Sequence, residues 1–178
     1  MAKRIRPVVI DGDIVRVPLT RGLEAVVDLA DIALVEGRNW CASDAGNTFY
    51  AVSAVAGSAT SGRTTLQMHR AIMGFEPGDP EVDHRDGDGL NNRRSNLREA
   101  TSAQNQANQR PQAARSSRFK GVCWNKWSQR WMAQINVDGR QRHLGRFADE
   151  VDAARAYDAA ALETWGEFAH LNFPTINP

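Results

Sequence analysis

The residues best suited to chemistry in this 178-residue chain gather between Glu81 and Gln109. An adjacent acid and imidazole, Asp83 and His84, precede a loop rich in aspartate and glycine. A protein core excludes such a stretch, because each buried polar group without a partner costs about 1–3 kcal/mol. These side chains must therefore face solvent, one another or a ligand. The asparagines of the stretch are Asn91, Asn92, Asn96, Asn105 and Asn108.

Local patterns place these residues on a strand, a loop, a second strand and a helix. Residues 82–85 form a short extended run that ends at a turn cluster, and residues 97–100 form another. Thr101 and Gln104 have the spacing of a capping box, which predicts a helix that starts after Thr101 and ends near Pro111.

Four motifs in this order resemble the HNH homing-endonuclease pattern: Val82-Asp83-His84, Leu90-Asn91-Asn92, Asn96-Leu97 and Gln104-Asn105. The resemblance implies a ββα-metal finger over residues 81–109, of the type found in phages and mobile elements. It makes His84 the general base and Asn96 the residue that orients the His84 ring. By the same resemblance, Asp83 and Asn105 would ligate the metal ion.

The chemistry suits these residue types. Hydrolysis of DNA needs a base to activate water and a hard cation to stabilise charge on the phosphate. An imidazole titrates near neutral pH, and an oxygen-only ligand set favours Mg²⁺ or Mn²⁺ over zinc. A calcium loop counted from Asp86 fails, because its sixth position is Asn91 and its twelfth is Leu97. The alternative is a solvated polar loop followed by a helix.

The composition is that of a globular protein with one or two domains. No long apolar run is present, so we expect no membrane span and no signal peptide. Cys41 and Cys123 lie far apart and form no Cys-x-x-Cys pair, so we expect no structural zinc and a reducing, cytoplasmic location. The resemblance to HNH endonucleases implies a phage- or bacterium-encoded protein.

The net charge of +1 conceals a strong segregation. Residues 91–147 contain twelve basic and two acidic residues, whereas residues 148–178 contain one basic and six acidic. The middle third therefore carries a field that would attract phosphates. Its basic residues are Arg93, Arg94, Arg98, Arg110, Arg115, Arg118, Lys120, Lys126, Arg130, Arg140, Arg142 and Arg146.

The N-terminal part predicts a small β-rich platform for the finger. We expect a hairpin with its turn at Asp11-Gly12, a helix over residues 28–36, strands at 40–42 and 49–52, a loop over 54–63 and a helix over 66–74. The last helix carries His69 and Arg70, a dipeptide common at this place in the resembled family. We assign His69 a structural or phosphate-contacting role and Arg70 a DNA phosphate.

The C-terminal part predicts a second module after a polar linker at 110–117. Residues 131–137 alternate as a half-buried strand does, Asp138-Gly139 is a hairpin turn, and residues 141–147 form the next strand. A helix over 150–164, with Asp149 as N-cap and Gly166 as its end, turns one small apolar face to the sheet. That face comprises Ala153, Ala154, Tyr157, Ala160 and Ala161.

Motifs across this module resemble the plant Apetala/ethylene-response-factor DNA-binding domain: Phe119-Lys120-Gly121-Val122, Trp131-x-Ala133-x-Ile135, Leu144-Gly145-x-Phe147, the alanine-rich helix and Leu171-Asn172-Phe173. The resemblance implies a three-stranded antiparallel sheet in the major groove, backed by the helix. Plant domains carry arginine at the positions of Lys120 and Cys123, and an aromatic residue at His143, so the target sequence does not transfer. The DNA-facing residues would be Lys120, Cys123, Asn125, Lys126, Trp127, Arg130, Gln134, Asn136, Arg140 and Arg142.

The sequence thus predicts an α+β protein with an HNH nuclease domain at 1–109, a linker at 110–117 and a DNA-binding module at 118–174. We expect a monomer that hydrolyses double-stranded DNA with one divalent ion. The alternative is a non-catalytic DNA-binding protein whose nuclease finger is vestigial.

Overall fold

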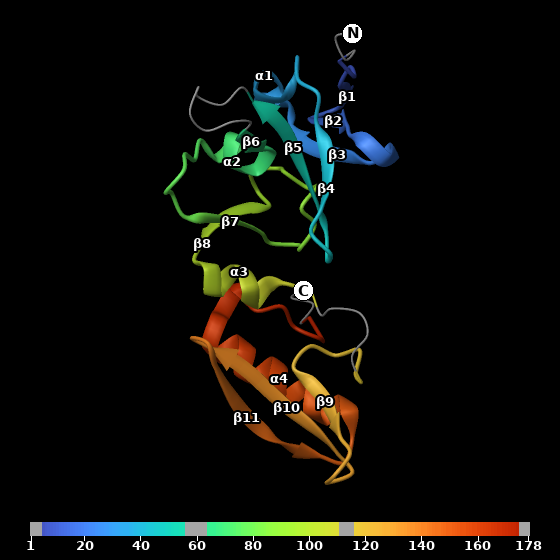
Figure 1. The fold of residues 1–178 in the computed structure, drawn as a ribbon, viewed down its shortest axis with the longest axis vertical. Helices are drawn as coiled ribbons and strands as arrows, with labels where there is room; N and C mark the ends of the chain where they lie inside the picture. Colours follow the sequence, from blue (N-terminus) through green and yellow to red (C-terminus); the bar gives the residue numbers. More distant parts are fainter. Residues whose placement is uncertain (1–4, 56–63, 111–115, 175–178) are drawn as a thin grey trace. The chain divides into compact units, whose positions relative to one another are not determined.

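The computed structural model describes residues 5–55, 64–110 and 116–174 (Figure 1). Contacts divide the chain into two compact units, Met1–Ala100 and Thr101–Pro178. Both are built from small antiparallel sheets with few helices, as the sequence predicted. Residues 56–63 of the expected loop and 111–115 of the expected linker lie outside the described residues. Within the described ranges, no helix has the length and apolarity that a membrane crossing requires.

The first sheet of the first unit is an antiparallel meander. Its strands are β1 (Val9–Asp11), β2 (Ile14–Pro18) and β3 (Glu24–Asp28), in that order. The β1–β2 turn occupies residues 12–13, one residue later than predicted, because Asp11 pairs with Ile14. A 3-10 turn, η1 (Thr20–Gly22), joins β2 to β3.

A second sheet and two short helices complete the platform. The sheet has the order β4 (Cys41–Asp44), β5 (Phe49–Val55) and β6 (Thr64–Gln67). The helix predicted over 28–36 is shorter: Asp28 pairs with β2, residues 29–31 form the 3-10 turn η2 (Leu29–Asp31), and only α1 (Ile32–Val35) is α-helical. The helix predicted over 66–74 starts later, since β6 pairs with β5, and α2 (Met68–Met73) ends at left-handed Gly74 as predicted.

The third sheet is the hairpin that carries the candidate chemistry. Its strands are β7 (Glu81–His84), one residue earlier than predicted, and β8 (Leu97–Ala100), in the predicted position. Val82 and Leu97 enter the same apolar core as Val15, Val27, Trp40 and Met68. The hairpin is therefore attached to the platform by burial of its own apolar side chains.

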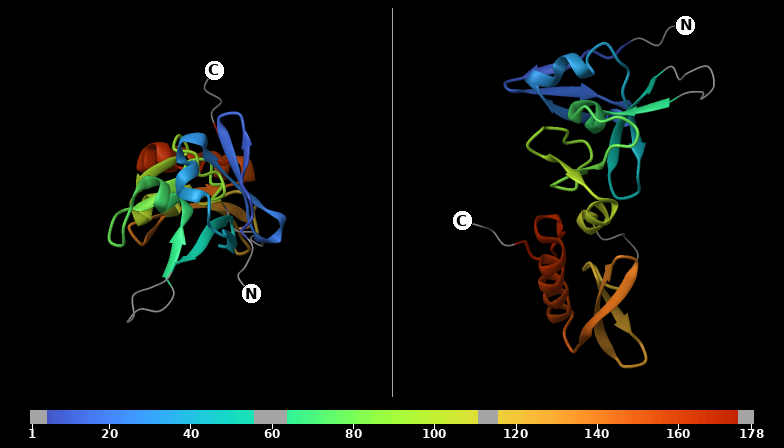
Figure 2. Two further views of the ribbon diagram at one scale, coloured as in Figure 1. Left: turned by 90° about the horizontal axis from the view of Figure 1, so that it is seen from above. Right: turned by 90° about the vertical axis from the view of Figure 1, so that its left-hand side faces the viewer.

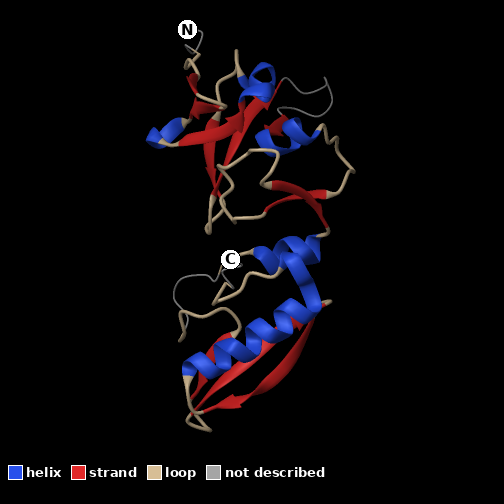
Figure 3. Ribbon diagram, turned by 180° about the vertical axis from the view of Figure 1, so that it is seen from behind, coloured by secondary structure: helices blue, strands red, loops and turns tan. Residues whose placement is uncertain are grey.

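The second unit starts with a helix and continues as a sheet covered by a longer helix. The elements are α3 (Ser102–Asn108), β9 (Val122–Asn125), β10 (Arg130–Val137), β11 (Arg140–Phe147), α4 (Glu150–Trp165) and the 3-10 turn η3 (Gly166–Phe168). The strand order is β11-β10-β9, all antiparallel. The helix α4 lies along one face of this sheet (Figures 2 and 3).

Several local predictions for this unit are confirmed. The Thr101–Gln104 capping box is formed in both directions, and Asp149 caps α4 by accepting from Val151 N–H at 2.7 Å. Asp138 and Gly139 both have positive φ, as a two-residue hairpin turn of type I′ requires. The buried residues of α4 are the five predicted: Ala153, Ala154, Tyr157, Ala160 and Ala161.

One glycine sets the distance between sheet and helix. A Cβ at Gly121, just before β9, would lie 1.9 Å from Tyr157 Cδ2 on α4, and Gly121 has a φ of +75°. No side chain fits this space, and the conformation disfavours any other residue. Gly121 thus allows the Tyr157 ring to lie directly against the start of the sheet.

Candidate nuclease site and nucleic-acid interface

His84 ends β7 inside a cluster of rings and amides. Its side chain is buried, and its Nε2 lies 3.3 Å from Asn92 Oδ1. The His69 ring meets it edge to face with centroids 5.1 Å apart, and the Tyr50 ring lies 5.7 Å away. Strand β5, helix α2 and the loop after β7 therefore converge on this imidazole.

The environment assigns a protonation state to His84. Burial lowers its pKa, although the Asn92 hydrogen bond and the charges of the nearby aspartates act in the opposite direction. The Asn92 amide is oriented by its Nδ2, which donates to Leu90 O at 3.1 Å, so Oδ1 faces the imidazole as an acceptor. With Asn92 Oδ1 as the acceptor, this contact assigns the proton of the neutral ring to Nε2.

Asp83 lies beside His84 in a buried ion pair. Its Oδ2 accepts from Arg98 Nε at 2.8 Å and lies 2.7 Å from Arg98 Nη2, and both side chains are almost fully buried. Arg98 faces Asp83 across the β7–β8 pair. This arginine was counted among the residues that attract phosphates, whereas the structure places it on the candidate metal ligand.

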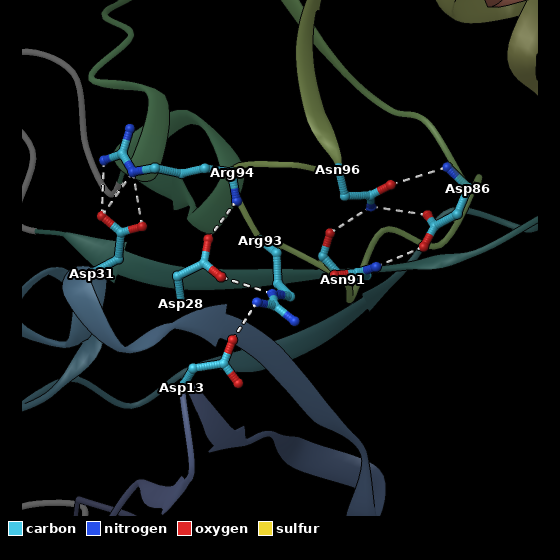
Figure 4. Close-up of polar contacts among 8 residues, drawn as sticks. All are labelled: Asp13, Asp28, Asp31, Asp86, Asn91, Arg93, Arg94 and Asn96. Carbon is cyan, nitrogen blue, oxygen red and sulfur yellow. Dashed lines mark hydrogen bonds and ion pairs between the residues drawn. The ribbon is translucent and has the colours of Figure 1, made fainter.

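The loop after β7 is organised by Asp86. Asp86 Oδ1 accepts from Asn96 Nδ2 at 2.9 Å, and Oδ2 accepts from Asn91 Nδ2 at 2.7 Å (Figure 4). The Asn96 Oδ1 accepts in return from Asp86 N–H at 3.1 Å. Asn96 was expected to orient His84; the structure instead places it on Asp86 and brings Asn92 to the His84 ring.

Two arginines join the same loop to the platform. Arg93 donates to Asp28 and Asp13 at 2.7 Å each, and Arg94 forms a two-pronged pair with Asp31 (Figure 4). Burial raises the pKa of Asp28, but hydrogen bonds from Arg94 N–H and Arg93 outweigh it and leave this pKa below its usual value. Both arginines, counted among the residues that attract phosphates, thus pair with carboxylates of the platform.

Backbone contacts hold the loop in the same place. Val26 of β3 donates to Leu90 O at 2.8 Å and accepts from Asn92 N–H at 2.7 Å, around an isolated bridge to Asn91. A Cβ at Gly89 would lie 2.5 Å from Phe49 O and 2.6 Å from the Tyr50 ring. The loop therefore packs against β3 and β5 at backbone distance, which sets the position of Asn92 beside His84.

The two α2 residues singled out from the sequence, His69 and Arg70, have different surroundings in the structure. His69 is buried, its Nδ1 has no hydrogen-bond partner among the described residues, and burial lowers its pKa to about 3. Arg70 donates to Pro80 O at 3.0 Å and to Glu76 O, and stacks on Phe75. Arg70, expected at a DNA phosphate, thus supports the turn before β7.

The second expected metal ligand, Asn105, is half-buried on α3, which belongs to the second unit. Among the described residues, no group of three or more histidine, cysteine, aspartate or glutamate side chains is arranged to hold a metal ion. An aspartate and an asparagine nevertheless provide the hard oxygen donors that Mg²⁺ and Mn²⁺ prefer. The donor chemistry fits such an ion.

The face of the β9–β11 sheet opposite α4 is polar. Residues paired across a sheet share a face, so Gln134 and Asn136 project with His143 and Gln141 away from α4. Arg146 and Cys123 join them, since both pair with Met132. The tip beyond this face carries exposed Lys126, exposed Arg130 and Trp127, whose side chain is 99% exposed.

Of the residues expected to face DNA, four either leave the sheet on its other side or use their side chains in contacts within the protein. Arg140 and Arg142 pair with Val137 and Ile135, so both leave the sheet on the α4 side, although both are exposed. Asn125 Oδ1 accepts from Trp127 and Ser128 N–H and thereby shapes the β9–β10 turn. The ammonium of Lys120 contacts carbonyls of α3.

The sequence reasoning missed Gln141, His143 and Arg146 on the outward face. The sequence did hold a signal for two of them: in a hairpin with its turn at Asp138-Gly139, residues equally far from the turn are paired, so residue 136 pairs with 141 and residue 134 with 143. It also missed Asn92, which no local pattern distinguishes from its asparagine neighbours.

Comparisons with known proteins define two classes of domain in this chain. A model described as "HNH endonuclease" matches residues 68–107, and a model described as "AP2 domain" matches residues 117–167. The first match spans α2, the His84 hairpin and most of α3, and the second spans the sheet and α4. Domains of both kinds bind DNA, and HNH domains generally use a divalent metal ion. The two matches support a DNA-binding, nuclease-like protein.

Curated proteins similar to this chain carry AP2-like names. Three AP2-like ethylene-responsive transcription factors of Arabidopsis thaliana are 40% identical over 73 residues, 41% over 70 and 41% over 73. These alignments include 35%, 34% and 35% of this chain, but only 17%, 23% and 21% of the relatives. The chain thus spans about a fifth of their length, and the likeness concerns the DNA-binding domain.

Proposed function

We propose that this protein is a metal-dependent DNA endonuclease of the HNH type, as in phages and mobile elements, directed to DNA by its AP2-like unit. The observation that carries the proposal is the buried, neutral His84 at the end of β7, beside the carboxylate of Asp83 and inside the HNH match. A neutral imidazole in this position can accept a proton from an attacking water.

In this mechanism, His84 deprotonates the water that attacks the scissile phosphate. Asn92 holds the imidazole through its contact with Nε2, and His69 and Tyr50 restrict the ring's motion. Asp83 and Asn105 would hold one divalent ion. When bound, that ion supplies positive charge to the phosphate and to the leaving 3′ oxygen.

The AP2-like unit would keep the protein bound to the DNA duplex. The outward amides of Gln134, Asn136 and Gln141 suit adenine edges, and Arg146 suits guanine or phosphate. Exposed Lys126 and Arg130 at the tip suit phosphates. A small finger has little surface for reading bases, so separating recognition from cutting is chemically reasonable.

A second candidate is a DNA-binding protein without catalysis. It is favoured by the curated relatives, whose names describe transcription factors, and by the Arg98 guanidinium on Asp83. It predicts duplex binding that weakens as salt rises and no metal-dependent cleavage.

Relaxation of supercoiled plasmid with Mg²⁺ or Mn²⁺, against EDTA, separates the two. The nuclease proposal expects nicking or cutting by wild type and its loss in both His84→Ala and His84→Gln, with duplex binding retained. The glutamine variant keeps a polar side chain of similar length, which guards against a folding defect. Duplex binding without any cleavage by wild type would overturn the proposal in favour of the second candidate.

A further inference from the structure

Lys120 is placed where the DNA-binding unit meets the end of its first helix. Its Nζ donates to Ala107 O at 2.5 Å, Gln109 O at 2.6 Å and Gln106 O at 3.4 Å. An ammonium has three N–H groups, so these three carbonyls use all of them. Burial lowers the pKa of Lys120 to about 8, which leaves the group mostly protonated at neutral pH.

The backbone of Lys120 is itself held from α4. Lys120 N–H donates to Asn172 Oδ1 at 2.7 Å, and Asn172 Nδ2 donates to Lys120 O at 3.1 Å. Asn172 Nδ2 also donates to Asp158 Oδ1, on α4, at 2.9 Å. Asp158, Asn172 and Lys120 form a continuous series of hydrogen bonds from α4 to α3, which we call the Lys120 clamp.

The helix α3 depends on this clamp more than a longer helix would. It has seven residues, too few to persist alone in water, and its last carbonyls have no partners within the helix. Its buried apolar contribution is Ala107, and a cavity of about 560 Å³ adjoins Ala103, Gln106 and Ala107. A cation at a helix C-terminus also matches the helix dipole. His170 N–H adds one bond to Ala107 O at 3.2 Å.

We infer that Lys120 is a positioning residue: through the clamp, the DNA-binding unit holds the helix that carries Asn105, rather than using Lys120 to contact DNA. This inference rests on the proposed function for the role of Asn105 in metal binding. The clamp itself concerns contacts within one unit. Lys120, which was expected to face DNA, thus supports the helix of the candidate metal ligand Asn105.

The test compares full-length wild type, Lys120→Met and Lys126→Met by amide hydrogen exchange. Lys120→Met keeps the long side chain and removes the ammonium, and should raise the exchange rate of the α3 amides by about tenfold or more. Exchange in β10 and β11 should stay unchanged, which shows that the unit remains folded. Lys126→Met removes an exposed lysine of the same unit and should leave α3 protection unchanged.

Function supplies the second readout. Lys120→Met should retain duplex affinity and its salt dependence. It should need about tenfold more Mg²⁺ for half-maximal cleavage, because a less ordered α3 would hold Asn105 less firmly in position to bind the ion. Lys126→Met should weaken duplex binding and reduce its salt dependence. Lys120→Arg, which keeps the charge, should recover part of the α3 protection.

Either of two results would overturn the clamp: equal α3 protection in Lys120→Met and wild type, or a loss of duplex affinity in Lys120→Met equal to that in Lys126→Met. If wild type cuts no DNA, the proposed function fails, whereas α3 exchange still decides whether the clamp exists.

Discussion

Lowering the pH from 7 to 5 should reduce the free energy of unfolding of the first unit, and protonation of His69 in the unfolded chain should cause a calculable part of this reduction. Burial, followed by the neighbouring His84 and Arg70, lowers the pKa of His69 from 6.5 to about 3. The unfolded chain therefore binds a proton below pH 6.5 that the folded unit does not accept until about pH 3. Stability is fully present above pH 6.5 and is lost as the pH falls toward 3.

The magnitude follows from the pKa difference. At pH 5 the medium lies about 1.5 units below the unfolded pKa and well above the folded one, so at about 1.4 kcal/mol per unit the loss is about 2 kcal/mol. Burial also lowers the pKa of His84, so the total loss in wild type should be larger.

Urea titrations at pH 7 and pH 5, read by hydrogen exchange on peptides from β5, would report on the first unit alone. His69→Phe keeps a ring against Tyr50 and His84 but cannot titrate, so its loss between the two pH values should be smaller by about 2 kcal/mol. His143→Phe, which removes an exposed histidine of the other unit, should behave as wild type. A His69→Phe variant that loses as much stability as wild type would refute the reasoning.

Three further predictions follow from named contacts. Arg98→Met leaves the buried Asp83 carboxylate without its guanidinium and should cost the first unit about 3–5 kcal/mol in urea unfolding; a loss under 1 kcal/mol would contradict the buried pair. Gly121→Ala should lower the free energy of unfolding of the second unit by more than about 2 kcal/mol, measured by circular dichroism, because its Cβ would overlap the Tyr157 ring. Lys126→Met should reduce the slope of log affinity against log salt by about 0.9 in duplex titrations, and an unchanged slope would remove Lys126 from the phosphate contacts.

The features that could be predicted from sequence are those decided by near neighbours. The Thr101–Gln104 capping box, the Asp138-Gly139 turn and the buried face of α4 each depend on residues within a few positions, and all are confirmed. The β7 and β8 strands were also predicted, because a turn cluster separates two short extended runs.

The features that could not be predicted depend on distant partners. The strand β3 was missed because its pairing with β2 decides its structure, and its last residue, Asp28, was assigned to the helix predicted over 28–36. Arg93 pairs with Asp13, 80 residues earlier, so its basic charge alone suggested a phosphate. Lys120 likewise faces carbonyls that only the folded second unit brings to it.

The bridge between Val26 and Asn91, together with the pairs made by Arg93 and Arg94, has a consequence for moving this motif between proteins. The matched stretch starts at residue 68, yet its loop takes partners from Asp13, Val26 and Asp31. A graft of the matched stretch alone would leave two arginines without carboxylates and Asn92 without its backbone support. The smallest transplantable cassette therefore includes the β1–β3 meander and η2, and a designer should transfer the scaffold and the hairpin as one piece.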